Sequence, residues 1–169
     1  MAQITIRTLT GADRGAAVEV INTAARWYRE FLPPEELHDP EMAAAQWDEE
    51  ARRLAWYGGA LDGVLVAVMG LEYSRDAALL RHAYILPEHQ HHGIGLRLAE
   101  HLEGVARREA AAHGIRRIIV GTYARNYKAR GALEKAGYRL SADSGSILRE
   151  YYAIPEDRLR ASVTYEKPA

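Results

Sequence analysis

The sequence predicts a single-domain α/β (α+β) protein in which helices flank a mixed central sheet. The chain has 169 residues, of which 48% are hydrophobic and 27% charged, as expected for one globular domain. A domain near that length buries roughly 70% of its unfolded surface, so it needs no covalent cross-link. Short apolar segments typical of strands alternate with segments of helical periodicity. We therefore expect one domain over residues 1–169, with the order β-α-α-β-β-β-α-β-α-β-β.

The first elements are a strand and a helix. Ile4 and Ile6 alternate with polar neighbours, which predicts a half-buried strand that ends at Thr10. Either Thr10 or Asp13 is placed to cap the helix that follows, because both side chains accept hydrogen bonds from free backbone N–H groups. This helix is expected to run to about residue 27 and to stop before the prolines at 33 and 34.

A second helix, a hairpin and a further strand come next. The helix is expected over residues 40–51, with Pro40 suited to its first turn. Strands over residues 54–60 and 64–71 flank the turn signal Leu61-Asp62-Gly63. The second of them lacks polar alternation, as in a strand that is covered on both faces. Another strand over residues 78–86 ends at Pro87.

The second half of the chain continues the alternation. Ile94, Leu98, Leu102 and Val105 are spaced by four, four and three residues, so they share one helix face, and Gly114 is placed to end that helix. The remaining elements are a strand over 115–121, a helix over 126–136, the start of a strand at 138–140 and a final strand over 162–166.

Charge and cysteine content exclude several functions. Lys and Arg number 22 against 23 Asp and Glu, a net charge of -1, so we expect neither a nucleic-acid nor a membrane partner. The chain has no cysteine, which excludes disulfides, Cys-ligated zinc and thiol nucleophiles. The first residues show no signal peptide or membrane span, which predicts a cytoplasmic protein.

The loop of residues 90–96, with the sequence Q-H-H-G-I-G-L, joins an apolar strand to an amphipathic helix. Gly93 and Gly95 allow the backbone to approach a ligand, and the free N–H groups of the helix point at it. Such a helix terminus binds anions and suits a pyrophosphate. The two glycines equally fit a plain tight turn. A dinucleotide fingerprint would need a third glycine where Leu98 stands, and a P-loop would need G-K-[ST].

This loop resembles motif A of the GNAT superfamily, the Gcn5-related N-acetyltransferases. The motif core is [RQ]-x-x-G-x-[GA], and the chain matches it within residues 85–95, I-L-P-E-H-Q-H-H-G-I-G. The following motif, N-x-x-A…E-K-x-G-[FY], resembles N-Y-K-A at 126–129 and E-K-A-G-Y at 134–138. Two further segments, 80–84 and 120–122, resemble a bacterial subgroup distantly similar to phosphinothricin acetyltransferases.

The resemblance implies a GNAT fold that uses acetyl-CoA as co-substrate, with no metal, between its fourth and fifth strands. Backbone groups of two strand residues would bond the pantetheine, N–H groups of the loop would hold the pyrophosphate, and an asparagine would bond the pantetheine arm. The implied cofactor-binding residues are Ile85, Leu86, Gln90, His91, His92, Gly93, Ile94, Gly95, Leu96 and Asn126.

A general base is needed to deprotonate an amine. His82 lies in the strand expected to face the cleft, and an imidazole takes up protons near neutral pH, although a strand histidine is more often a core residue. Glu72 competes for this role; it equally fits a solvated carboxylate at a strand end. The family often uses a Glu in the fourth strand, but the aligned position is Leu79, so that assignment does not transfer.

The general acid of the family is a tyrosine seven residues after the motif asparagine. That position is Leu133, which cannot donate a proton. Tyr123 and Tyr127 are the candidate substitutes because both fall at the strand-to-helix junction. The alternatives are that water assists the departing thiolate or that the protein is not an active transferase.

The expected acceptor is the primary amine of a small molecule, with Tyr28, Tyr73 and Tyr84 as candidate pocket residues. The alternatives are a catalytically inactive acyl-CoA-binding sensor or interaction module on the same fold and, with less support, a nucleotide-binding regulator. The histidines do not indicate a metal site, because no H-E-x-x-H spacing occurs. The extra segment of residues 144–160 either covers the site or builds a homodimer contact, and the acidic run at residues 48–50 is expected to be a solvated helix face.

Overall fold

The computed structural model describes residues 3–30, 32, 34, 37–90 and 92–169, without the side chains of Tyr28, Asp157 and Arg158. Within these residues seven strands form one sheet in the order β1-β2-β3-β4-β5-β7-β6. Adjacent strands are antiparallel, except that β4 and β5 are parallel. The strands are β1 Ile4–Thr8, β2 Leu54–Leu61, β3 Val64–Ser74, β4 Ala77–Ile85, β5 Arg117–Tyr123, β6 Arg139–Leu140 and β7 Ser162–Pro168.

The helices confirm the predicted fold class and extend the predicted order. The α-helices are α1 Arg14–Ala25, α2 Ala44–Glu50, α3 Ile94–His113, α4 Tyr127–Lys135, α5 Ser144–Glu150 and α6 Glu156–Leu159, and short 3₁₀ turns are η1 Gly11–Asp13, η2 Arg26–Glu30 and η4 Pro87–His89. The sequence analysis did not foresee α5 and α6, which lie between β6 and β7. In the described part of the chain, every helix is too short or too polar to cross a membrane.

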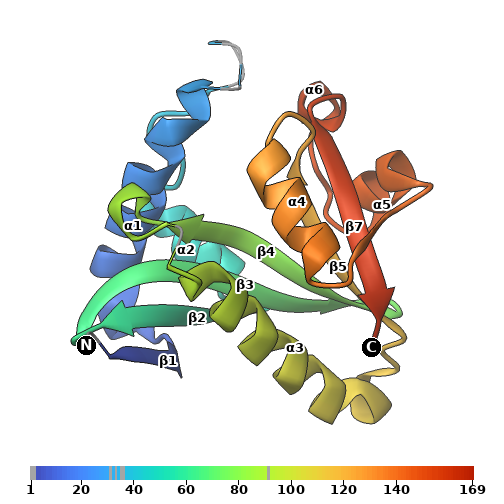
Figure 1. Ribbon diagram of the computed structural model, residues 1–169, viewed down its shortest axis with the longest axis horizontal. Helices are drawn as coiled ribbons and strands as arrows, with labels where there is room; N and C mark the ends of the chain where they lie inside the picture. Colours follow the sequence, from blue (N-terminus) through green and yellow to red (C-terminus); the bar gives the residue numbers. More distant parts are fainter. Residues whose placement is uncertain (1–2, 31, 33, 35–36, 91) are drawn as a thin grey trace.

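Alternating side chains of the central strands build a core on each face of the sheet. Leu71 and Leu80, which are paired across β3 and β4, pack with Leu98 of α3. The paired residues Val68 and Tyr84 face the other way, toward α1 and α2. Figure 1 shows α3 across the front of β2–β4, with α1 and α2 behind them. A third cluster joins α5 to β4 and β5 on the face opposite α3.

A bulge interrupts β4 in the middle of the sheet. Arg81 pairs with Gly70 and Tyr84 pairs with Val68, so two residues of β4 lie opposite a single residue of β3. His82, one of the two, has a φ of 53°, which is rare for a residue with a side chain. Arg81 and His82 are therefore both directed to the face that carries α2 and α5, where a regular strand would send them to opposite faces.

The two parallel strands part soon after they meet. Pairing of β4 with β5 extends only from Ala77 and Arg117 to Leu80 and Val120, whereas both strands continue further. Figure 1 shows the half of the sheet with β5 and β7 turned away from the half with β1–β4. Beyond Leu80 and Val120 the two strands no longer pair with each other, so their facing edges border the space between them. We call the point of separation, at Leu80 and Val120, the fork.

Candidate active site

A cleft of about 520 Å³ occupies the space beyond the fork. Residues of β4 and α3 line one side, residues of β5 and α4 line the other, and residues from η2 and from the segment between β6 and β7 contribute to it. The cleft therefore reaches both faces of the sheet. Its volume is in the range of small-molecule sites.

The N-terminus of α3 lies on this cleft. Gly93 precedes the helix with a φ of 76°, and the Arg97 N–H makes a helical bond of 3.0 Å to its carbonyl oxygen. The N–H groups before Arg97, in the first turn, have no partner within the helix and form its positive end. Gly93, Ile94, Gly95 and Leu96 all line the cleft. His92 is exposed and does not line it, and His91 lies outside the described residues.

Gly95 marks a close approach between α3 and β4. A Cβ atom at this position would collide with the side chain of Ile85. Gly93 has open space around its Cα, but its positive φ disfavours any other residue there. The two glycines therefore have different roles. Gly93 lets the chain turn into α3, and Gly95 leaves the N–H groups of the first turn uncovered.

Local hydrogen bonds fix the positions of four residues that the sequence analysis assigned to cofactor binding. The Gln90 side chain lines the cleft and donates to the Ile85 carbonyl at 3.3 Å, and that oxygen can accept a second bond. The N–H of Leu86 is instead used within the sheet, in a 3.0 Å bond to β3, and Leu86 does not line the cleft. Asn126 lines the cleft and caps α4, accepting from the Ala129 N–H at 3.2 Å. This cap leaves the amide N–H groups of Asn126 for other partners.

His82 lines the cleft from the face opposite the N-terminus of α3. Its Nε2 lies 3.2 Å from Oε2 of Glu50, and its ring lies 5.5 Å from that of Trp56. The His82 side chain is 21% exposed, which combines a fixed position with access from the cleft. Burial acts to raise the pKa of Glu50, but the hydrogen bond with His82 and the charges of His82, Arg81 and Arg53 together hold that pKa below its usual value.

Glu50 is the residue that the sequence analysis missed. The run at 48–50 was expected to be a solvated helix face, and this holds for Asp48 and Glu49, which form exposed ion pairs. The Glu50 side chain is half-buried at the end of α2, between His82 and Arg53. Helix α2 has only seven residues, too few for its periodicity to reveal which carboxylate turns inward.

The second candidate base, Glu72, does not reach the cleft. Its carboxylate lies 3.2 Å from Arg81 and 3.1 Å from Arg53, and the side chains of Glu72 and Arg81 are each only 8% exposed. Glu72 is absent from the lining of the cleft. It therefore supports Arg81 within the sheet and has no access to a substrate proton.

The candidate tyrosines separate into two groups. Tyr84 and Tyr123 line the cleft, and the hydroxyl of Tyr84 donates to Glu41 at 3.3 Å. The side chain of Tyr127 is directed to solvent, with 72% of the residue exposed, and does not line the cleft. Tyr73 donates to Glu109 of α3 in a separate depression. The Tyr28 side chain lies outside the described residues.

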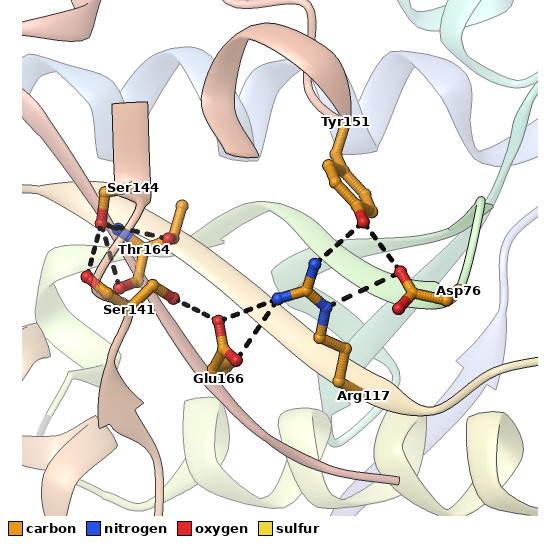
Figure 2. Close-up of polar contacts among 7 residues, drawn as sticks. All are labelled: Asp76, Arg117, Ser141, Ser144, Tyr151, Thr164 and Glu166. Atoms are coloured by element: carbon orange, nitrogen blue, oxygen red, sulfur yellow. Dashed lines mark hydrogen bonds and ion pairs between the residues drawn. The ribbon is translucent and has the colours of Figure 1, made fainter. Parts of the chain in front are cut away.

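The segment between β6 and β7 covers the inner end of the cleft, where Leu148, Tyr152 and Ile154 line it. Figure 2 shows how the segment is held on the sheet. The Tyr151 hydroxyl donates to Asp76 and accepts from Arg117, both at 2.8 Å, while Arg117 also bonds Glu166. At the start of α5, hydroxyl groups of Ser144 and Thr164 bond each other, as Figure 2 also shows. The segment therefore covers one end of the cleft, which is one of the two roles left open by the sequence.

Metal ligands do not gather in the described part of the chain, where no group of three or more His, Asp or Glu side chains is placed to hold an ion. The cleft combines backbone N–H and C=O groups with polar side chains of both charges, among them His82, His89, Lys128, Glu41 and Asn126.

Solved structures with the same fold are acetyltransferases. The PaiA N-acetyltransferase of Thermoplasma acidophilum, in complex with coenzyme A, matches with a TM-score of 0.79 and 19% identity over 99% of each chain. The ribosomal-protein-S18-alanine N-acetyltransferase of Escherichia coli gives 0.68 at 18% identity, covering 98% of this chain and 94% of that chain. An acetyltransferase of Thermus thermophilus gives 0.67 at 21%, covering 99% and 97%. Identities at this level show the fold alone.

The sequence itself supplies the family. No curated protein sequence matches the chain significantly. A model of the acetyltransferase (GNAT) family matches residues 18–138, a span that begins within α1 and includes the cleft-lining parts of β4, α3, β5 and α4. Because this match covers well over half of the chain and includes the glycine loop at the N-terminus of α3, the chain belongs to the GNAT family of acetyltransferases, enzymes that use acyl-CoA as the acyl donor.

Proposed function

We propose that the chain transfers the acetyl group of acetyl-CoA to the primary amine of a small molecule by direct attack of the amine on the thioester. The observation that carries this proposal is the position of the His82–Glu50 pair. The bulge of β4 directs His82 into the cleft from one face of the sheet, while the glycine loop and the start of α3 meet the cleft on the other. Donor and acceptor would thus approach the fork from opposite faces.

The residues around the loop fit a coenzyme A donor. N–H groups in the first turn of α3 would hold the pyrophosphate. Gly95 leaves these groups uncovered because it has no side chain, and a Cβ atom there would collide with Ile85. His89 and Lys128 also line the cleft and supply basic groups. Main-chain groups on the facing edges of β4 and β5, with the amide of Asn126, would bond the pantetheine arm. Acetyl-CoA supplies the thioester-activated acetyl group.

The His82–Glu50 pair would deprotonate the amine, which is the main energetic cost of amine acetylation. An alkyl ammonium has a pKa near 10.4, so forming the neutral amine at pH 7 accounts for roughly 4–5 kcal/mol. His82 would take this proton, and the Glu50 carboxylate would orient the ring and stabilise the imidazolium. The bulge also leaves one residue of β4 outside the regular ladder, so a main-chain N–H there would stabilise the thioester oxygen as it gains charge.

The acceptor would bind on the face of the sheet that carries α1 and α2. Trp27, Glu41 and Tyr84 line the cleft there, and the carboxylate of Glu41 suits an incoming ammonium. A cleft of about 520 Å³ that also takes the pantetheine arm leaves room for a small acceptor only. The resemblance of residues 80–84 and 120–122 to proteins distantly similar to phosphinothricin acetyltransferases points the same way.

Glu41→Gln should raise KM for the amine about tenfold with little change in kcat, because it removes the attraction for the cation and leaves the reacting groups in place. Steady-state kinetics at saturating acetyl-CoA measures both constants. Glu49→Gln removes an equal charge from an exposed position of α2 and should leave KM unchanged. An equal rise of KM in the two variants would show that only the net charge matters.

A mass-spectrometric screen of primary amines with acetyl-CoA tests the proposed reaction. The expected result is a mass gain of one acetyl group on at least one small amine, dependent on the enzyme. The other candidate is a catalytically inactive acyl-CoA-binding module. Calorimetric binding of acetyl-CoA without acetylation of any amine in the panel would favour that candidate and refute the proposed reaction.

A further inference from the structure

Tyr152 occupies the fork between the two parallel strands. Its hydroxyl donates a hydrogen bond to the carbonyl oxygen of Ile119 in β5 at 3.0 Å and lies 3.5 Å from that of Leu80 in β4. The N–H of Gly121, the first residue of β5 beyond the pairing with β4, interacts with the same phenol oxygen. The phenol thus bridges the strands where the regular ladder ends.

The side chain is held rigidly in this position. Tyr152 is 5% exposed, its ring lies 5.2 Å from the guanidinium carbon of Arg81, and Arg81 donates to its carbonyl oxygen. The next residue, Ala153, has a φ of 52°, a strained conformation that turns the chain away from the sheet. The neighbouring Tyr151 holds the segment from outside through Asp76 and Arg117, as Figure 2 shows.

The reacting end of the donor must come close to this phenol. Acetyl-CoA held by its pyrophosphate at the start of α3, with its arm between β4 and β5, would direct its thioester toward the fork. Tyr152 lines the cleft at that end. Tyr123 lies at the last residue of β5, three residues beyond Val120, and Tyr127 is directed to solvent. At the position where the family places a tyrosine, Leu133 has no proton to donate.

We infer that the hydroxyl of Tyr152 turns from the Ile119 carbonyl when coenzyme A is bound, and donates a hydrogen bond, and then its proton, to the departing sulfur. This inference rests on the acetyl transfer proposed above. It assigns the segment between β6 and β7 a direct part in the reaction, beyond covering the cleft.

The protons and electrons of the step balance as follows. The ammonium loses a first proton to His82, which releases it to solvent, and the neutral amine then forms the C–N bond and gives a second proton to His82. The C–S bond then breaks with its electron pair remaining on sulfur, and the Tyr152 proton moves to that sulfur. The proton held by His82 returns to the phenol through water, so the enzyme is restored. The products are the acetamide and coenzyme A with a free thiol.

The phenol of Tyr152 is present in its protonated form. Burial raises the pKa of Tyr152 above its ordinary value, although the Arg81 charge and the Gly121 N–H act to lower it. The hydroxyl therefore stays protonated throughout the pH range of an assay. A loss of rate on its removal should be similar at every pH, unlike the loss expected for a general base.

The test is a titration of the coenzyme A thiol bound to the enzyme, followed by the S–H stretching band in Raman spectra. The chain has no cysteine, so this band belongs to coenzyme A alone. A hydrogen-bond donor at the sulfur favours the thiolate. We expect the pKa of the bound thiol to lie below that of free coenzyme A and to rise by about one pH unit in Tyr152→Phe, a tenfold change in the ionisation constant.

Tyr151→Phe is the matched control. It also loses one hydroxyl from the same segment, and with it the bonds to Asp76 and Arg117, but Tyr151 does not line the cleft. Its bound thiol should titrate as in the wild type. For the amine turned over fastest in the screen, Tyr152→Phe should lower kcat about 100-fold at all pH values without raising KM for acetyl-CoA. Tyr151→Phe should change kcat by no more than a few-fold.

An unchanged thiol pKa in Tyr152→Phe, or equal shifts in the two variants, would overturn the inference. If Tyr152→Phe does not fold, the thiol pKa measured on the wild-type protein still tests the inference. A bound thiol with the pKa of free coenzyme A is incompatible with a hydrogen-bond donor at the sulfur. Failure of the proposed function looks different, since coenzyme A would then not bind, or no amine would be acetylated although the thiol pKa is lowered.

Discussion

Replacing Gly95 with leucine should weaken acetyl-CoA binding about 100-fold while the protein stays folded. The new side chain collides with Ile85 and covers the first turn of α3, where N–H groups would hold the pyrophosphate. A hydrogen bond to a charged group contributes roughly 1.5–3 kcal/mol, so the loss of two such bonds is at least about 100-fold in affinity. Gly93→Leu should act in the same direction, because its φ of 76° is unfavourable for leucine and the turn into the helix would shift.

Calorimetry with acetyl-CoA measures the affinity, and thermal unfolding with free coenzyme A provides a second measurement. Ligand that binds only the folded state raises the unfolding temperature, so the wild type should be stabilised and Gly95→Leu should not. Gly104→Ala in the same helix is the control. Only the flexible end of Arg108 approaches its new methyl group, so this variant should fold at least as stably and bind normally. Unchanged affinity in both leucine variants would place the donor elsewhere.

Replacing His82 with asparagine should lower kcat about 10²–10⁴-fold near neutral pH, the range typical of a lost general base. Asparagine tolerates the positive φ of this position, so the bulge should persist and the KM for acetyl-CoA should not change. The rate should recover in part as the pH approaches that at which the amine is neutral without help. Glu50→Gln keeps the imidazole but removes its charged partner, so a smaller loss is expected.

A pH–rate profile for each variant checks this prediction. The control is His113→Asn, because His113 also lies beside a carboxylate, 3.8 Å from Glu109, and stacks on Tyr73 outside the cleft. It should keep the wild-type profile. If His82→Asn keeps that profile too, water carries the proton and His82 has a structural role next to Trp56 and Glu50.

The local elements of the fold were predictable because their signals are local. Hydrophobic spacing identified α3, and glycine identified both of its ends, since a positive φ at Gly93 and Gly114 is a property of the residue itself. Helices α5 and α6 were missed because each has seven residues or fewer, which is too short for a periodic pattern. The glycine loop was also recognisable in the sequence, because its glycines form a local motif and its proposed ligand contacts come from the backbone.

The side chains of the site depended on tertiary structure. His82 and Glu50 are 32 residues apart, and only the bulge of β4 directs the imidazole toward α2. The spacing placed Tyr127 near the cofactor, but the direction of its side chain follows from how α4 packs, and it points to solvent.

The sequence by itself determined the fold class, through short-range hydrophobic periodicity, and the family, through the motifs within residues 18–138 that the family model matches. It also predicts that the glycine loop binds the donor. Only the tertiary structure decided which acidic and phenolic groups meet at the cleft. Tyr152 reaches the fork across 72 residues from Leu80, through a segment that Ile147 and Leu148 pack against β4 and β5. Contacts of this kind form only when the strands part and the segment packs over them. Local spacing of residues in the sequence therefore cannot predict them.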